Sequence, residues 1–291
     1  MRPTDARATA FDAYCRRKEA AAAAAPLAGF RTVLDRASGQ GLRPLGNAWR
    51  QALFDGPFYV REAGTPGLPA VSLVFVQSRD GNTVTEDPST LGGGETDLHV
   101  IYEGLSRVAA DAVLAGASTA RGKATVFSVW HPQLVALRRD IGKPRHPAQV
   151  VVTGSADLPI EEGLMFTMPE LPVFVIAPSG AAGLLRSRLR GRPWADVIDA
   201  GEPLSMTVAM RQVHARGLRV ISAVGGRRTA TSLMREGLVR DFYLTTSAVP
   251  AGEPNTPFYA GEPPRMQAVL EKAGRGAESG VRFEHLLIEP R

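Results

Sequence analysis

Cysteine is almost absent from this chain of 291 residues, and its scarcity excludes several classes of protein. The single residue, Cys15, cannot form an internal disulfide framework or a cysteine-rich zinc site. No apolar run approaches the roughly 18–20 residues of a membrane span, so we expect no membrane partner. The histidines show no metal-ligand spacing either, and we predict no metal site.

Lysine and aromatic residues are also scarce, although the net charge is +5. The cations are mostly arginines spread along the chain, and aromatic residues make up only 7% of it. A nucleic-acid-binding protein usually clusters its cations and interleaves them with aromatic side chains. We therefore expect no nucleic-acid partner.

The N-terminal segment superficially resembles an export signal, because alanines 20–25 follow Arg16-Arg17-Lys18. Glu19, however, stands where the apolar core of a signal would begin, and no clear cleavage site follows. Alanine favours helix and Pro26 would end one, so we predict a helix over residues 9–25. The expected location is the cytoplasm.

The sequence changes character near residue 69. Residues 1–69 contain the alanine run and turn-rich segments, and we predict a partly helical N-terminal extension that packs on the main domain or on a partner. From 70 to 291, short apolar segments alternate with helical periodicity, which predicts one α/β domain. Its central sheet should be mixed and flanked by helices on both faces, because the last strand-like segments have no helix between them.

Individual elements can be placed from the same periodicity. We predict strands at 71–76, 112–115, 149–153, 173–177, 219–223, 242–246 and 281–288, and helices at 131–139, 204–216 and 225–236. A further helix should begin at Asp97 as its N-cap, since Leu98, Ile101, Leu105 and Val108 follow at helical spacing.

Two segments after predicted strands are suited to phosphate, and ligands of open α/β sheets bind beyond the carboxyl ends of the strands. Residues 116–121 begin with a glycine and include Thr119 and Arg121, whose side chains can bind phosphate. Gly225 and Gly226 precede a predicted helix, whose first amides are free to hold an anion. The alternatives are ordinary tight turns.

A third such segment runs from Ser78 to Asn82. A buried Asp80 at the end of a strand could bind a polar substrate or supply a proton. The alternative is a common Asp-Gly turn.

Taken in order, these segments resemble the reductase domain of the bifunctional riboflavin-biosynthesis deaminase–reductase, a member of the dihydrofolate reductase-like superfamily. The residues that carry the resemblance are Ser78, Asp80 and Gly81, residues 111–121, residues 157–159, Gly225 and Gly226, residues 237–239, and residues 242–246. The resemblance covers roughly residues 70–290 and leaves the extension unmatched.

The resemblance implies a dihydrofolate reductase-like fold, usually a homodimer, that moves a hydride from NADPH to a ribosylamino-pyrimidine, 5-amino-6-(5-phosphoribosylamino)uracil. The implied cofactor-binding residues are Gly116, Thr119, Arg121, Thr153, Ser155, Gly225, Gly226 and Thr229. The implied substrate-binding residues are Ser78, Asp80 and Arg107, and Asp80 is the best candidate for a catalytic role. The lone cysteine excludes the zinc deaminase half, which needs a Pro-Cys-x-x-Cys segment.

Several residues depart from the family pattern. Val224 stands where the family commonly has a glutamate before the two glycines, and Arg240-Asp241 stands for Asp-Glu. These departures keep two alternatives open. One is a dihydrofolate- or pterin-type, or specialised-metabolite, reductase on the same fold. The other is a non-catalytic nucleotide- or partner-binding protein that docks through residues 1–69.

Overall fold

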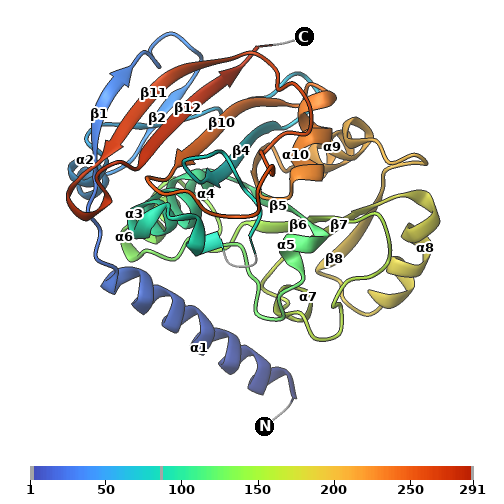
Figure 1. The fold of residues 1–291 in the computed structure, drawn as a ribbon. Helices are drawn as coiled ribbons and strands as arrows, with labels where there is room; N and C mark the ends of the chain where they lie inside the picture. Colours follow the sequence, from blue (N-terminus) through green and yellow to red (C-terminus); the bar gives the residue numbers. More distant parts are fainter. Residues whose placement is uncertain (1–2, 86–87, 290–291) are drawn as a thin grey trace.

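A mixed sheet forms the centre of the molecule (Figure 1). The computed structural model describes residues 3–85 and 88–289. Within these residues, ten strands pair in the order β1-β11-β12-β10-β4-β9-β5-β6-β7-β8. Neighbours from β10 to β8 are parallel, whereas β12, β11 and β1 add antiparallel pairs at one end, as predicted.

The strands of this sheet are β1 (Phe30–Asp35), β4 (Ala70–Gln77), β5 (Ala112–Gly116), β6 (Ala148–Val152), β7 (Val173–Ala177), β8 (Ala195–Asp199), β9 (Val220–Val224), β10 (Val239–Thr246), β11 (Met266–Gly274) and β12 (Arg282–Ile288). A separate hairpin pairs β2 (Arg43–Leu45) with β3 (Phe58–Val60).

The helices are α1 (Pro3–Ala24), α2 (Ala48–Phe54), α3 (Gly94–Thr96), a π-helix η2 (Asp97–Leu105), α4 (Ser106–Val108), α5 (Ala117–Ala120), α6 (Pro132–Asp140), α7 (Leu164–Thr167), α8 (Ser179–Arg188), α9 (Met206–Ala215) and α10 (Arg227–Arg235). Two short 3₁₀ turns are η1 (Pro88–Leu91) and η3 (Gly276–Glu278). None of the helices in the described part of the chain is long and apolar enough to cross a membrane.

Helices cover both faces of the sheet, as the sequence predicted. Successive residues of a strand point to opposite faces, and β5 shows this in its packing. Val113 belongs to one buried apolar cluster with Leu134 of α6, whereas Leu114 belongs to another with Met210 of α9 and Leu233 of α10. The core is therefore double, with one half on each side of the sheet.

Part of the predicted extension lies inside this core. Strand β1 is the edge strand beside β11, and Phe30, Phe54 and Phe58 pack around Phe283 of β12. Strand β11 was not among the predicted strands, because Lys272 interrupts its apolar pattern. Lys272 is fully buried, and its ammonium group donates hydrogen bonds within the extension. The domain boundary at residue 69 stays a prediction.

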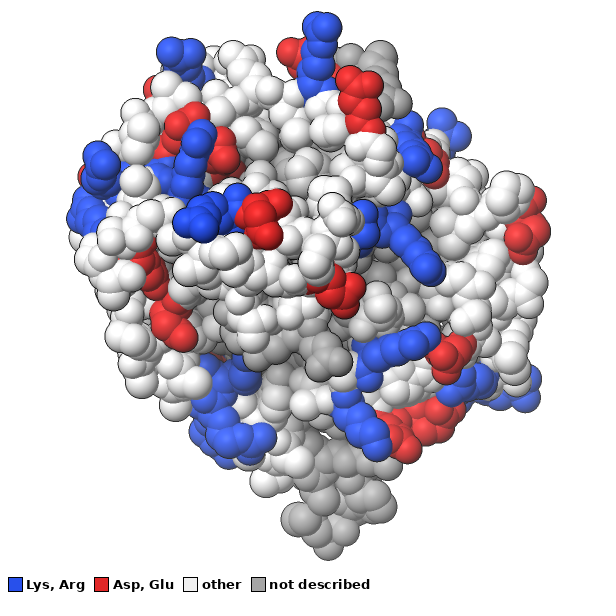
Figure 2. Space-filling model, in the orientation of Figure 1, with Lys and Arg blue, Asp and Glu red and all other residues white. Residues whose placement is uncertain are grey.

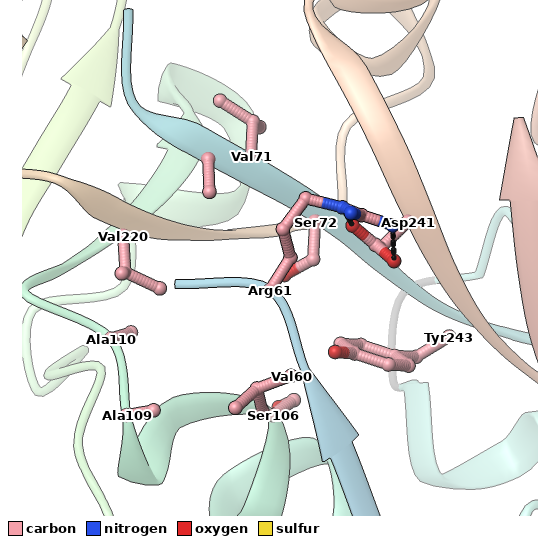
Figure 3. Close-up of a pocket in the computed structure, with 11 residues that line it drawn as sticks. Val60, Arg61, Val71, Ser72, Ser106, Ala109, Ala110, Val220, Asp241 and Tyr243 are labelled. Atoms are coloured by element: carbon pink, nitrogen blue, oxygen red, sulfur yellow. Dashed lines mark hydrogen bonds and ion pairs between the residues drawn. The ribbon is translucent and has the colours of Figure 1, made fainter. Parts of the chain in front are cut away.

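A buried ion cluster also joins the extension to the sheet (Figure 3). Arg61 follows β3 and donates to Asp241 of β10 over 2.7 Å, while His285 of β12 lies 2.9 Å from the same carboxylate. Figure 3 shows Arg61 and Asp241 beside Ser72 and Tyr243. These four residues line a cavity of about 10 Å³. That volume holds about one water molecule, so we assign the cluster to stability.

Helix α1 lies against the body of the protein, along the lower side of Figure 1. Phe11 is buried, Tyr14 meets the edge of Trp130, and Lys18 pairs with Glu103 over 3.2 Å. Figure 2 shows positive and negative side chains interspersed on the face of the molecule in view.

Asp111 holds three neighbouring strands in register at their amino ends. Its carboxylate accepts hydrogen bonds from the backbone amides of Arg219 and Val220 over 2.8 and 2.9 Å, where β9 begins, and from Lys143 over 2.5 Å. Its own carbonyl accepts from the amide of Ala148 at the start of β6. Burial raises the pKa of Asp111, but the Lys143 ammonium and the two amides outweigh burial and hold that pKa below its usual range.

We expect Asp111→Ala to lower the free energy of unfolding by about 2–4 kcal/mol, because it leaves two amides and a half-buried ammonium without their acceptor. Urea denaturation measures the loss. Glu62→Ala is the control, since Glu62 forms an exposed ion pair with Arg43 and should change stability by less than about 1 kcal/mol. Equal losses in the two variants would contradict this role for Asp111.

Candidate active site

The predicted ligand-binding segments meet at the carboxyl ends of the central strands, which we call the carboxyl edge of the sheet. Strand β9 lies between β4 and β5, with Val74 opposite Val224 and Leu114 opposite Ala223, and β6 follows β5 with Val152 opposite Gly116. All four strands are parallel, so the segments that follow them emerge side by side. In Figure 1 these strands form the middle of the sheet.

The turns after β5 and β9 are in direct contact, and glycine is needed for it. A Cβ atom on Gly116 would lie only 2.9 Å from Oγ1 of Thr229, and one on Gly225 would lie 3.4 Å from Oγ1 of Thr119. A Cβ on Gly226 would meet the backbone of Gly116 at 3.7 Å. The structure therefore brings five of the predicted cofactor residues together.

Gly225 and Gly226 also present the start of α10 to this edge. Both have positive φ angles, +69° and +82°, which glycine adopts without strain. Gly226 is the N-cap of α10, and no side chain caps that end. The positive end of the dipole of this nine-residue helix therefore faces the carboxyl edge, where its first amides can bind an anion.

The other three predicted cofactor residues border the same edge. Thr153 is buried, and its hydroxyl donates to the Ser155 carbonyl over 2.7 Å, so it shapes the turn after β6. Ser155 is exposed. Arg121 pairs with Asp157 over 3.0 Å across the turns after β5 and β6, and both side chains are well exposed.

The turn after β4 is organised around a carboxylate that the sequence analysis expected to be buried. That expectation is wrong, because Asp80 is exposed. It accepts hydrogen bonds from the Ser78 hydroxyl and from the Asn82 amide group. The Ser78 hydroxyl lowers the pKa of Asp80, so at neutral pH Asp80 can accept hydrogen bonds but cannot supply a proton.

A second segment, residues 249–260, holds this turn against α10. The carbonyl of Val249 accepts from the Arg79 amide over 2.9 Å, and Thr256 bonds to Asn82 and Thr83. At its other end, the carbonyl of Pro257 accepts from the Arg227 guanidinium of α10. This bridge was not predicted, since its contacts involve backbone atoms and leave no residue pattern in the sequence.

Arg107, predicted as a substrate-binding residue, is not at this edge. It is fully buried, donates to the Ser128 carbonyl over 3.0 Å and lies over the Tyr102 ring. Its neighbour Ser106 lines the small cavity of Figure 3 together with Ala70, the first residue of β4. Eight residues of β4 separate that end from the Ser78 turn, a distance of about 25 Å.

Asp97 is not the helix N-cap that the sequence predicted. Helical backbone already begins at Gly94, and Asp97 itself has helical angles, so the N-cap prediction is wrong. Its side chain is buried and accepts a hydrogen bond from the hydroxyl of Thr245, which pairs with Val76 near the end of β4. Burial chiefly raises the pKa of Asp97, to about 7.

The glycine run 92–94 is the sequence signal that could have pointed to this buried acid. A Cβ atom on Gly93 would lie 2.9 Å from Oδ2 of Asp97 and equally close to Val76. The loop approaches the carboxyl group closely because it lacks side chains there.

These features define an open α/β protein whose parallel strands end in contacting glycine turns, which is the class that binds ligands at the carboxyl edge of its sheet. The family model of the RibD C-terminal domain matches residues 69–275, most of the chain. The chain belongs to this family. No curated protein matches it.

Solved structures with the same fold agree with this assignment. A pyrimidine reductase-like protein from Corynebacterium diphtheriae matches with a TM-score of 0.62 and 21% identity, over 77% of this chain and 93% of that one. RibD from Acinetobacter baumannii gives 0.59 and 14% identity, over 77% of this chain and 58% of that one. The Saccharomyces cerevisiae riboflavin biosynthesis reductase Rib7 gives 0.54 and 13%, over 78% and 93%.

We expect the protonated Asp97 to give stability a distinctive pH dependence. Its pKa is raised from 3.8 to about 7 in the folded chain, so the folded state holds the proton more tightly than the unfolded chain does. The stability that this proton contributes is complete below about pH 4 and is lost as the pH rises through about 7.

Asp97→Asn keeps a neutral hydrogen-bonding group, so its melting temperature should rise relative to the unmodified protein as the pH rises over that range. Thermal unfolding across the range measures the difference. Asp140→Asn, the same change at an exposed position, should leave the pH profile unaltered. Parallel profiles for the protein and Asp97→Asn would show that Asp97 is not held protonated.

Proposed function

We propose that the chain is an NADPH-dependent reductase of a pyrimidine-type substrate, with 5-amino-6-(5-phosphoribosylamino)uracil as the first candidate. Membership in the RibD C-terminal domain family supports a reductase. The observation that carries the proposal is the contact between the Gly116 turn and the Gly225-Gly226 turn, beside the exposed Asp80 carboxylate. The homodimer implied by the resemblance and the cytoplasmic location expected from the N-terminal segment stay predictions.

The residues at the glycine turns fit a dinucleotide phosphate group. The contacts of Gly116, Gly225 and Gly226 hold the two turns together, and the first amides of α10, which no side chain caps, can hold a phosphate there. The hydroxyls of Thr119 and Thr229 border it. When bound there, the nicotinamide would supply the hydride.

The chain's own contribution is to bind and orient. Arg121 and Ser155, on the adjacent turns, are exposed and can reach the ribose and phosphate groups of the same nucleotide. Asp80, ionised at neutral pH, would accept hydrogen bonds from N–H groups of the pyrimidine. The bridge formed by residues 249–260 would keep this carboxylate at a fixed distance from the glycine turns.

One observation favours a second candidate, a specialised-metabolite or pterin-type reductase on the same fold. Val224 is fully buried in the apolar core, where the resembled family commonly has a glutamate. The chain therefore lacks a carboxylate that the resemblance places near the nicotinamide and the ribosylamino-pyrimidine. Loss of NADPH absorbance with the ribosylamino-pyrimidine, but not with dihydrofolate, would reject this candidate.

We expect Gly226→Ala to weaken NADPH binding by about tenfold or more, because alanine is strained at a φ of +82° and relief of that strain would shift the first amides of α10. Fluorescence titration with NADPH gives the dissociation constant. Gly217→Ala is the matched control, since Gly217 also has a positive φ, +85°, but follows α9 at the other edge of the sheet. It should lose stability and keep its affinity.

Two results would contradict the proposal. Titration of the unmodified chain without saturable NADPH binding would reject the cofactor. Binding without hydride transfer to either substrate would favour the non-catalytic nucleotide-binding alternative.

A further inference from the structure

A second cavity lies at the edge of the sheet opposite the candidate active site. Its volume is about 560 Å³, and it lies between helix α1 and the segments that lead into β5, β6, β7 and β9. Phe11 and Cys15 of α1 form one wall, and Phe174 and Leu218 belong to the other. Residues 1–68, and therefore α1, lie outside the matched family segment, so this wall is an addition to the matched domain.

The size and the walls of this cavity suit a small organic molecule. Ligand pockets are usually about 300–1,000 Å³ in volume, mostly apolar, and carry few polar groups. Phe174 is half-buried, so its ring can pack against a ligand, and the buried Phe11 closes the wall formed by α1. The Phe174 ring can also attract a cation.

The positive groups around the cavity are paired, uncharged or buried away from it. Arg138 is fully buried and donates to the backbone carbonyls of residues 107, 108 and 110. Lys143 is paired with Asp111 and Arg145 with Glu19, each over 2.5 Å. Burial, together with the charges of Arg145 and Arg138, lowers the pKa of His146 to about 3, so this imidazole is neutral. None of them leaves an unpaired positive charge for an anionic ligand.

Two carboxylates that line the cavity, unlike the positive groups, are unpaired within residues 3–85 and 88–289. Asp12 and Glu170 are exposed lining residues, and neither forms an ion pair with any residue in the described part of the chain. They come from separate elements, α1 and the loop before β7. In a chain of net charge +5, this cavity therefore combines apolar walls with a negative entrance.

We propose that this cavity binds an amphiphilic organic cation. Its apolar body packs against Phe174 and the wall that Phe11 closes, and its ammonium group lies at the entrance between the Asp12 and Glu170 carboxylates. The inference is independent of the proposed reductase function, because the cavity shares no residue with the carboxyl edge of the sheet.

The probe is 4-phenylbutylammonium, and 4-phenylbutanol is its uncharged counterpart. Calorimetric titration of the full chain should show saturable binding of the cation, weaker at high salt. The alcohol should bind about tenfold more weakly, which corresponds to about 1.4 kcal/mol, since it lacks the charge that the two carboxylates attract. Equal affinity of the two compounds, or no saturable binding of the cation, would overturn the proposal.

Cys15 gives a second readout, since it is the only thiol in the chain and lines the cavity. Burial chiefly raises the pKa of Cys15 to about 11, so its alkylation is slow and is best followed at mildly alkaline pH. Saturating 4-phenylbutylammonium should slow alkylation several-fold. Alkylation at an unchanged rate would show that the probe binds elsewhere.

Two matched double variants distinguish the effect of the entrance carboxylates from the effect of the net charge of the protein. Asp12→Asn with Glu170→Gln should weaken binding of the cation about tenfold and leave binding of the alcohol unchanged. Glu62→Gln with Glu262→Gln removes the same charge from other exposed positions and should change neither. Equal affinities for the cation in the two double variants would overturn the role of the entrance.

Discussion

The hydrogen bonds of the Asp111 carboxylate fix where β9 begins, and the position of β9 decides the rest of the site. Strand β9 comes late in the chain, yet it lies between β4 and β5. A shift of one residue in its register would turn the buried Val224 to the other face of the sheet and move the two glycines that follow it. The Asp111 carboxylate, which prevents this shift, binds the first residue of β9, whereas the two glycines follow its last residue.

Much of the fold followed from the sequence because its strands are short, apolar and buried on both faces. Strands β4, β5, β6, β7 and β9 are mostly apolar, with Ser72, Gln149 and Ser222 as polar interruptions, and a parallel sheet between two helical layers favours such strands. Strands β1 and β11 escaped prediction because their patterns mix apolar and charged residues. Lys272 is buried only because the Thr32 hydroxyl and the Asp55 carbonyl of the distant extension accept its hydrogen bonds.

The residues of the candidate site also divide into those that the sequence could place and those that it could not. The glycine turns could be predicted, because a glycine at the end of a strand indicates close approach whatever approaches it. Asp80, Asp97 and Arg107 could not be placed, since a charged residue type does not reveal whether water or protein surrounds it. Asp97 lies beside glycines that admit it to the interior, whereas Asp80 is held at the surface by its neighbours Ser78 and Asn82.

The carboxyl and amino ends of the strands differ in how tightly they are packed. This difference explains at which end a binding site can be added. At the carboxyl edge, the turns after β5 and β9 touch so closely that a single Cβ atom at Gly116 would displace Thr229. At the amino edge, Asp111 and its partners satisfy the strand ends locally, and α1 closes over them without entering the sheet. A helix added there can change its inner surface without moving a glycine turn. The extension is therefore free to carry a binding specificity that the matched family segment does not encode.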